Sequence, residues 1–139
     1  MEKPNEAAGA IVALPPVIES DAGTIQNLPL SMVDRYQQGP GVAVIHCKAG
    51  SVRSNHWHRR DWHYLYVISG EMEYHEAEMP QCNPIHVRLV KAGQMVFTAA
   101  GMAHATKFVV DTVLLSIARC PQDAMSRDGD CVKLERVLI

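Results

Sequence analysis

The stretch from Ser51 to Gly70, SVRSNHWHRRDWHYLYVISG, decides the fold and carries most of the chemistry of this 139-residue chain. Its second half, HYLYVIS, is rich in β-branched and aromatic residues and ends at a Ser-Gly turn, which predicts a strand. Successive side chains of a strand point to opposite faces, so the odd-numbered residues of this run share one face. We therefore expect His63 to face the interior of the domain, whereas Tyr64 and Tyr66 face outward.

The first half of the same stretch contains His56 and His58, separated by one tryptophan. In a strand these two imidazoles point the same way and lie side by side, with Trp57 on the opposite face. His104 follows well downstream, at the start of another expected strand. Three or four imidazoles that converge in an apolar interior bind a transition metal through neutral ring nitrogens. The clustering alone leaves this interpretation evenly balanced against histidines that are merely satisfied polar groups of strands.

Short runs of the same kind continue along the chain from Val42 onward, with turn residues such as Ala92-Gly93 between them. Many short strands separated by turns predict an all-β protein, a small antiparallel β-barrel or jelly roll. The runs are VAVIHC, HYLYVIS, EMEYHEAE, IHVRLV, MVFTA, ATKFVV and TVLLSIA. Within MVFTA, we expect Met95 and Phe97 to form an inward-facing pair.

Length and charge limit the organisation of the chain and its partners. With 139 residues the chain is long enough for one domain with a core and too short for two. We expect residues 1–20 to form an N-terminal arm or tail and residues 21–139 to form the single domain. The net charge of −2 argues against a dedicated binder of nucleic acid or of membrane surfaces. The apolar stretches are too short to cross a bilayer.

The cysteines and the N-terminus indicate a cytoplasmic protein. Cys47, Cys82, Cys120 and Cys131 are widely spaced and form no C-x-x-C pair. This spacing favours free thiols in a reducing compartment over disulfides or a zinc site. The N-terminus carries two glutamates and only a brief apolar run, unlike a secretory signal.

The spacing of the histidines resembles a known signature. Gly50, His56, His58, His63 and Gly70 follow the pattern G-x5-H-x-H-x4-H-x6-G. This pattern resembles the first signature motif of the cupin superfamily, G-x5-H-x-H-x3-4-E-x6-G, with a histidine in place of the glutamate.

A second stretch resembles the second cupin motif, G-x5-P-x-G-x2-H-x3-N. Gly93, Gly101 and His104 match its glycines and its histidine at the right spacing, whereas Ala99 stands at the proline and Phe108 at the asparagine. The resemblance implies the fold of that family, a small antiparallel β-barrel of jelly-roll type, which agrees with the strand pattern.

The resemblance also implies a metal centre. In metal-binding cupins the motif histidines and the glutamate hold one ion inside the barrel, which assigns His56, His58 and His104 as ligands. His63 takes the glutamate position. We expect it to be the fourth ligand of an all-histidine site, with a role as an orienting group or an acid–base residue left open. Such a site suits iron, manganese, nickel, copper or zinc alike.

A narrower likeness concerns the substrate. The run R-x-N-H-x-H is similar to that of cupins associated with nucleotide-sugar and polysaccharide biosynthesis, where glycine is usual at the position of Ser54. Arg53, just before the histidine pair, is the candidate for binding an anionic substrate. The alternative is that it belongs to a solvated strand edge.

Three hypotheses for function follow. The first is a metal-dependent enzyme that acts on a small organic molecule as an oxygenase, an isomerase or a lyase. The second is a nucleotide-sugar isomerase or epimerase in which His63 or His104 is the general base. The third is a ligand-binding or sensor cupin without catalysis. The outward-facing tyrosines favour a homodimer, because another subunit usually covers an aromatic outer face.

Overall fold

The computed structural model describes residue 11 and residues 13–28, 40–119 and 129–139, and these residues form strands and no helix. Within these ranges no helix is therefore available to cross a membrane. The strands are β1 (Ile18–Ser20), β2 (Gly23–Asn27), β3 (Gly41–Cys47), β4 (Val52–His58), β5 (His63–Ser69), β6 (Glu71–Glu78), β7 (His86–Lys91), β8 (Met95–Thr98), β9 (Met102–Lys107), β10 (Thr112–Ala118) and β11 (Cys131–Lys133).

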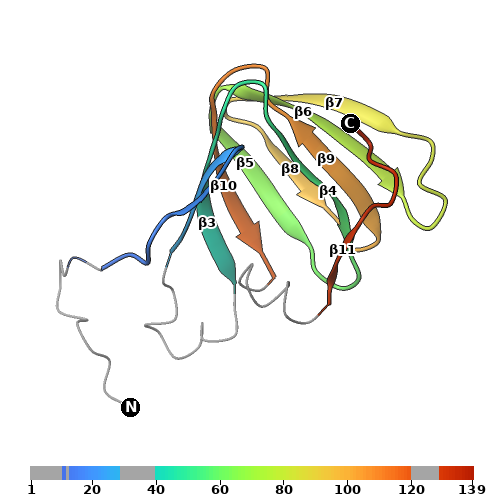
Figure 1. Ribbon diagram of the computed structural model, residues 1–139, viewed down its shortest axis with the longest axis horizontal. Coiled ribbons are helices and arrows are strands. Elements are labelled where there is room, and N and C mark those ends of the chain that lie inside the picture. The colour runs from blue at the N-terminus through green and yellow to red at the C-terminus, as the bar shows by residue number, and fades with distance from the viewer. Residues whose placement is uncertain (1–10, 12, 29–39, 120–128) are drawn as a thin grey trace, which may run out of the picture.

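The strands form two antiparallel sheets that face each other (Figure 1). One sheet has the order β1-β2-β3-β10-β5-β8 and the other has the order β11-β4-β9-β6-β7. Each sheet also pairs strands that are distant in sequence, such as β3 with β10 and β4 with β9. The prediction of an all-β jelly roll is confirmed, with the described strands arranged as two separate sheets rather than one continuously paired barrel.

The core lies between the sheets and follows from the alternation of the strands. In β5 the burial alternates, with His63, Leu65 and Val67 buried and the tyrosines between them more exposed. The strands β5, β6 and β10 have the bounds that the sequence predicts. Two large core residues, Tyr74 and Phe108, are fully buried. The hydroxyl of Tyr74 is satisfied by Thr98 Oγ1 at 2.6 Å, so the core buries this polar atom at little cost.

The orientation expected for β8 is wrong. Met95 is 54% exposed and Phe97 is 47% exposed, whereas Val96 and Thr98 take the inner face. The pairing of β8 with β5 explains the difference, because it places Phe97 opposite Tyr64 on the outer face. The two rings pack there with their centroids 4.9 Å apart. Phe97, on the edge strand β8, therefore packs against Tyr64 on the outer face of the sheet and not in the core.

The expected N-terminal arm falls largely outside the description, since residues 1–10 and residue 12 are not described. Its last three residues, Ile18–Ser20, form β1, which is exposed and pairs with β2. The division into an arm and a domain stays a prediction.

Candidate metal centre

Four histidines from three strands meet between the two sheets. His56 and His58 lie on β4, and His104 lies on the neighbouring strand β9, directly opposite His56 in the register. His63 begins β5 in the other sheet. The ring centroid of His104 lies 4.7 Å from that of His56, 5.7 Å from that of His58 and 4.9 Å from that of His63. The structure thus brings together all four histidines singled out in the sequence.

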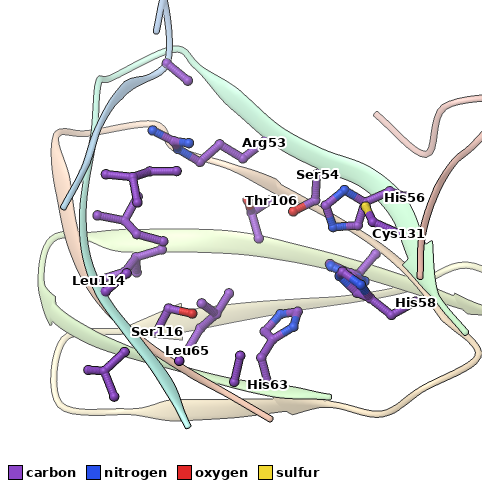
Figure 2. Close-up of a pocket in the computed structure, with 18 of the residues that line it drawn as sticks. Arg53, Ser54, His56, His58, His63, Leu65, Thr106, Leu114, Ser116 and Cys131 are labelled. Carbon is purple, nitrogen blue, oxygen red and sulfur yellow. The ribbon is translucent and has the colours of Figure 1, made fainter. Parts of the chain in front are cut away.

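The histidines line one end of a cavity of about 420 Å³ between the sheets. Apolar side chains such as Leu65 and Leu114 line the side of the opposite sheet, and Arg53 lies at the far end from His58 (Figure 2). No carboxylate is among the described residues that line the cavity. The volume suits a small organic molecule, and proton transfers within the cavity would fall to a histidine, to the Cys131 thiol or to the substrate.

His104 is held in one tautomer with a free nitrogen. Its Nδ1 lies 3.1 Å from the carbonyl oxygen of Met102, and because a carbonyl only accepts, Nδ1 carries the proton and donates it. The Nε2 atom therefore carries a lone pair. Only 1% of this side chain is exposed, and Nε2 has no hydrogen-bond partner among the described residues. A buried nitrogen of this kind is costly unless a partner completes it.

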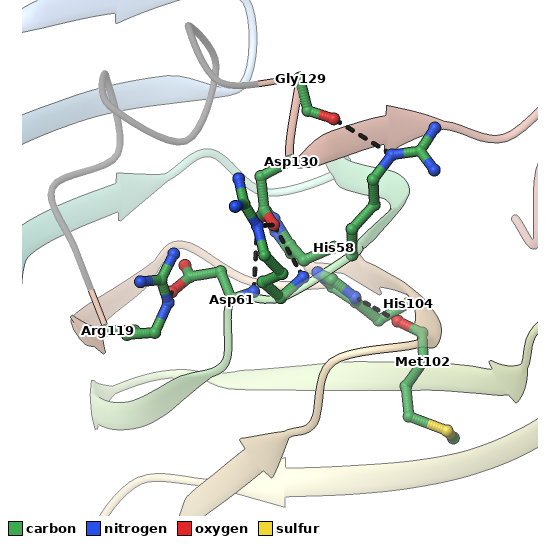
Figure 3. Close-up of polar contacts among 9 residues, drawn as sticks. His58, Asp61, Met102, His104, Arg119, Gly129 and Asp130 are labelled. Carbon is green, nitrogen blue, oxygen red and sulfur yellow. Dashed lines mark hydrogen bonds and ion pairs between the residues drawn. The ribbon is translucent and has the colours of Figure 1, made fainter.

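His58 is oriented by a carboxylate that the sequence analysis did not single out. The Nδ1 atom of His58 lies 3.2 Å from Oδ2 of Asp130 (Figure 3). Asp130 also accepts hydrogen bonds from the backbone N–H groups of Arg60, at 2.7 Å, and Asp61, at 3.3 Å. Burial raises the pKa of Asp130, but these hydrogen bonds together with His58 outweigh it and lower the pKa overall. The ionised carboxylate fixes the proton of His58 on Nδ1 and leaves Nε2 available, as in carboxylate–histidine–metal arrangements.

Burial keeps three of these histidines, His56, His63 and His104, neutral at physiological pH. Burial lowers the pKa of His56 to about 3, and the neighbouring His104 and His58 act in the same direction. Burial also lowers the pKa of His104 to about 4, against the opposing effect of its hydrogen bond to Met102. The pKa of His63 lies well below its ordinary value for the same reason, burial. Neutral imidazole is the form that ligates metals.

The donor atoms of three of the four histidines lie close enough together to suit a divalent transition metal, whereas His56 is grouped with His58 and Cys131. Ring nitrogens of His58, His63 and His104 all lie within 4.8 Å of one another. Two nitrogens bound to one ion at about 2.1 Å can be at most about 4.2 Å apart, so small rotations of the rings bring these atoms to ligating distance. The buried lone pair of His104 and the all-nitrogen donor set agree with an ion of borderline softness rather than with calcium or magnesium.

A β-bulge in β4 lets Arg53 share the cavity with the histidines. In the pairing with β9, Arg53 is opposite Thr106 and His56 is opposite His104, so β4 has one more residue than β9 over this interval. The additional residue is accommodated at Ser54 and Asn55, whose φ angles are +74° and +56°. Without the bulge, strand alternation would place Arg53 and His56 on opposite faces.

The Arg53 side chain reaches the cavity with part of its guanidinium unsatisfied. Its Nε and Nη2 atoms are buried and have no hydrogen-bond partner within the described part of the chain. The geometry therefore differs from a solvated strand edge, which was the alternative interpretation of this residue.

Strand β11 and the residue before it bring to the site two residues, Asp130 and Cys131, that sequence spacing did not reveal. The strand pairs with β4, with Cys131 opposite His58, and it follows directly on Asp130. The only signal in the sequence is the turn SRDGD before a short apolar stretch. A turn does not say which distant strand the following residues join.

Comparisons with known proteins agree with this architecture. No protein-family model matches the chain. No curated protein sequence matches it either. Among solved structures, the capsular polysaccharide assembling protein CapF from Staphylococcus aureus superposes with a TM-score of 0.71 at 18% identity, over 91% of this chain and 33% of that one. A mutant of the oxalate decarboxylase OxdC from Bacillus subtilis gives a TM-score of 0.68 at 14% identity, over 86% of this chain and 30% of that one.

A third similar structure is the oxalate decarboxylase of Lactobacillus farciminis in complex with formate, with a TM-score of 0.63 at 14% identity, over 76% of this chain and 31% of that one. The chain thus spans about a third of the length of these proteins. The chain has the fold of the cupin superfamily, with a histidine-rich potential metal site in its interior.

Proposed function

We propose that this chain is a metal-dependent cupin enzyme that acts on a small organic anion, with His56, His58, His63 and His104 as the ligands of one divalent transition metal ion. The observation that carries the proposal is the buried Nε2 of His104, which has no hydrogen-bond partner among the described residues and lies in a cluster of four imidazoles at the end of a cavity. When bound, such an ion supplies Lewis-acid polarisation of a substrate oxygen.

Arg53 supports an anionic substrate. Its guanidinium lies in the same cavity as the histidines, and unsatisfied N–H donors there recognise a carboxylate or a phosphate through paired hydrogen bonds. A substrate held by Arg53 at one end directs its other polar group toward the histidines. The apolar wall around Leu65 and Leu114 excludes water from the intervening space.

The direct test is metal content of the full chain purified without a histidine tag. We expect about one equivalent of a transition metal after reconstitution, and its loss in His104→Ala and in His58→Ala. The matched control is His86→Ala, because His86 is exposed on β7 and should leave the content unchanged. Less than about a tenth of an equivalent in the unmodified chain, with no gain on reconstitution, would overturn the proposal.

The reaction class is tested on the metal-loaded protein. Dioxygen uptake with small keto acids and diketones reports oxygenation, and product analysis under nitrogen reports isomerisation or lyase chemistry. Arg53→Lys keeps the charge but loses the planar pair of donors, so we expect a higher KM with the metal content unchanged. If no reaction is found while anions still bind, the ligand-binding or sensor hypothesis replaces the enzymatic one.

A second candidate function is a nucleotide-sugar isomerase or epimerase with His63 or His104 as general base. The similarity to CapF favours it, and Arg53 suits the phosphate of a nucleotide sugar. The two candidates differ in their response to a chelator. Activity on nucleotide sugars that survives complete metal removal supports this second candidate and contradicts the first.

We further propose that the protein is a cytoplasmic homodimer. Cys47, Cys82 and Cys131 are free thiols, as a reducing compartment requires. On the outer face of β5 and β8, Tyr66 is 37% exposed and Phe97 is 47% exposed, which favours cover by a second copy of the chain.

A further inference from the structure

The C-terminal strand places a thiol beside the histidine cluster. Cys131 lies on β11, opposite His58 of β4, and lines the same cavity. Its Sγ atom and ring nitrogens of His56 and His58 all lie within 4.8 Å of one another. Figure 2 shows the sulfur next to the His56 ring. These three donors form a second group that shares His58 with the group containing His63 and His104.

The position of this thiol is fixed from both sides. Before it, Asp130 is anchored by the N–H groups of Arg60 and Asp61, and the Asp130 carbonyl accepts from the N–H of Arg59 at 2.9 Å. After it, the N–H of Leu134 donates to the carbonyl of Asn55 at 3.0 Å. A donor held on a paired strand in this way is already placed for ligation, so little conformational entropy is lost when an ion binds.

The unpartnered Nε2 of His104 is an independent indication that an ion belongs here. This atom is fully buried and belongs to the group that shares His58 with Cys131. The Nδ1 atom of His58 donates its hydrogen to the carboxylate of Asp130, and the Nδ1 atom of His104 donates its hydrogen to the carbonyl of Met102. In both rings Nε2 is therefore the nitrogen that keeps its lone pair for an ion.

We propose that Cys131 is a thiolate ligand of the metal held by the four histidines, so that the site takes a thiophilic ion. This inference rests on the proposed metal centre and deepens it. Coordination of the sulfur releases the thiol proton to solvent and adds one negative charge to an otherwise neutral donor set. Thiolate together with imidazole selects zinc, copper or iron, whereas manganese prefers oxygen ligands.

The experiment is cobalt substitution of the full chain after metal removal under anaerobic conditions. Cobalt(II) reports its binding by visible ligand-field bands and reports a bound sulfur by a thiolate-to-cobalt charge-transfer band in the near ultraviolet. We expect both sets of bands in the unmodified chain. In Cys131→Ser we expect loss of the charge-transfer band, retention of visible bands, and a fall in zinc affinity of at least about tenfold with manganese affinity unchanged.

The matched control is Cys82→Ser, because Cys82 is a free thiol of intermediate burial like Cys131. It should keep both sets of bands. Visible bands without the charge-transfer band in the unmodified chain overturn the assignment of Cys131 and leave the histidine site standing. Absence of all cobalt bands overturns the histidine site itself. A charge-transfer band that persists in Cys131→Ser also overturns the assignment. The spectrum of the unmodified chain decides the main question even if a variant fails to fold.

Discussion

At the scale of single residues, His63 changes the charge of the candidate centre. A glutamate at this position would add one negative charge to the donor set, whereas a neutral imidazole adds none. A more positive centre attracts anions more strongly and polarises a bound oxygen further. This agrees with Arg53 in the same cavity, since both groups favour a substrate that brings negative charge with it.

The lowered pKa values predict an acid-sensitive metal-free protein. In the unfolded chain each histidine titrates near 6.5, whereas in the folded chain the pKa of His56 is about 3 and that of His104 is about 4. Between these values the unfolded chain binds more protons, so the free energy of unfolding must fall as the pH falls. The contribution of these neutral histidines to the free energy of unfolding is therefore complete above about pH 6.5 and decreases progressively as the pH falls below it.

Urea unfolding in the presence of a chelator, at a series of pH values, measures this effect. The interval from about pH 6.5 to about pH 5 is the informative one, because most carboxylates stay ionised there. His86→Gln removes an exposed histidine of β7 and should leave the profile unchanged, whereas His104→Gln should make it shallower. A free energy of unfolding that is constant over this interval would contradict the assignment of buried neutral histidines.

The contact between Asp130 and His58 predicts that a substitution of Asp130 weakens metal binding although no ligand is removed. In Asp130→Asn, an amide N–H₂ placed against the N–H of His58 repels it, which disturbs the tautomer that leaves Nε2 free. Loss of such an orienting partner typically weakens metal binding by about 10- to 100-fold. Competition with a chromophoric chelator measures the affinity, and Asp21→Asn, at an exposed position, is the control. An unchanged affinity in Asp130→Asn would show that the carboxylate does not position His58.

At the scale of elements, the bulge in β4 depends on an unfavourable backbone conformation at Ser54. Its φ of +74° lies in the left-handed region, which costs a non-glycine residue about 1–2 kcal/mol. Glycine relieves this strain but loses about 0.5–1 kcal/mol of chain entropy on folding. We expect Ser54→Gly to raise the free energy of unfolding by up to about 1 kcal/mol.

The control for this prediction is Ser69→Gly, at the end of β5, where the backbone has no positive φ. That substitution should lower the free energy of unfolding by about 0.5–1 kcal/mol. Equal destabilisation in both variants, measured by urea unfolding, would contradict the strain at Ser54. Retention of metal in Ser54→Gly would show that the bulge itself persists.

The bulge and β8 also show where sequence reasoning stops. Alternation correctly predicts that His63 faces the interior, because β5 is paired on both sides and its pairing with β10 is regular from His63 to Val67. It cannot predict that Arg53 and His56 share a face, because a bulge shifts the alternation by one residue. It is wrong for Phe97, because the pairing of the edge strand β8 with β5 places this ring opposite Tyr64 on the outer face. Periodicity gives the positions of strands but not their irregularities or what covers their outer faces.

At the scale of the whole molecule, the site is assembled by long-range pairing. The motif spacing predicts the four histidines because two local segments carry them. Asp130 and Cys131 come from the opposite end of the sequence and reach the site only because β11 pairs with β4. Nothing in a local pattern fixes such a pairing, which is decided by the sheet edge that the rest of the fold leaves available. The sequence therefore locates the candidate ligands better than the residues that lie beside them and orient them.

The last prediction concerns the outer face of the sheet that contains β5 and β8. Among the described strands, β8 is paired on one side only, so its free edge can pair with a second β8 across a two-fold axis. Met95, 54% exposed on this strand, would be buried by such a contact. Light scattering coupled to size exclusion should give twice the 15.4 kDa mass of one chain.

The substitution Met95→Lys places a charge in that contact and should produce monomers, because an unpaired buried charge is costly. Val109→Lys is the control, since Val109 is 66% exposed outside the β5–β8 face and should leave the dimer intact. A mass of one chain for the unmodified protein would contradict the dimer. Equal dissociation by both variants would place the interface elsewhere. Because the histidine cluster lies between the sheets of a single chain, metal content should be the same in the monomeric variant as in the dimer.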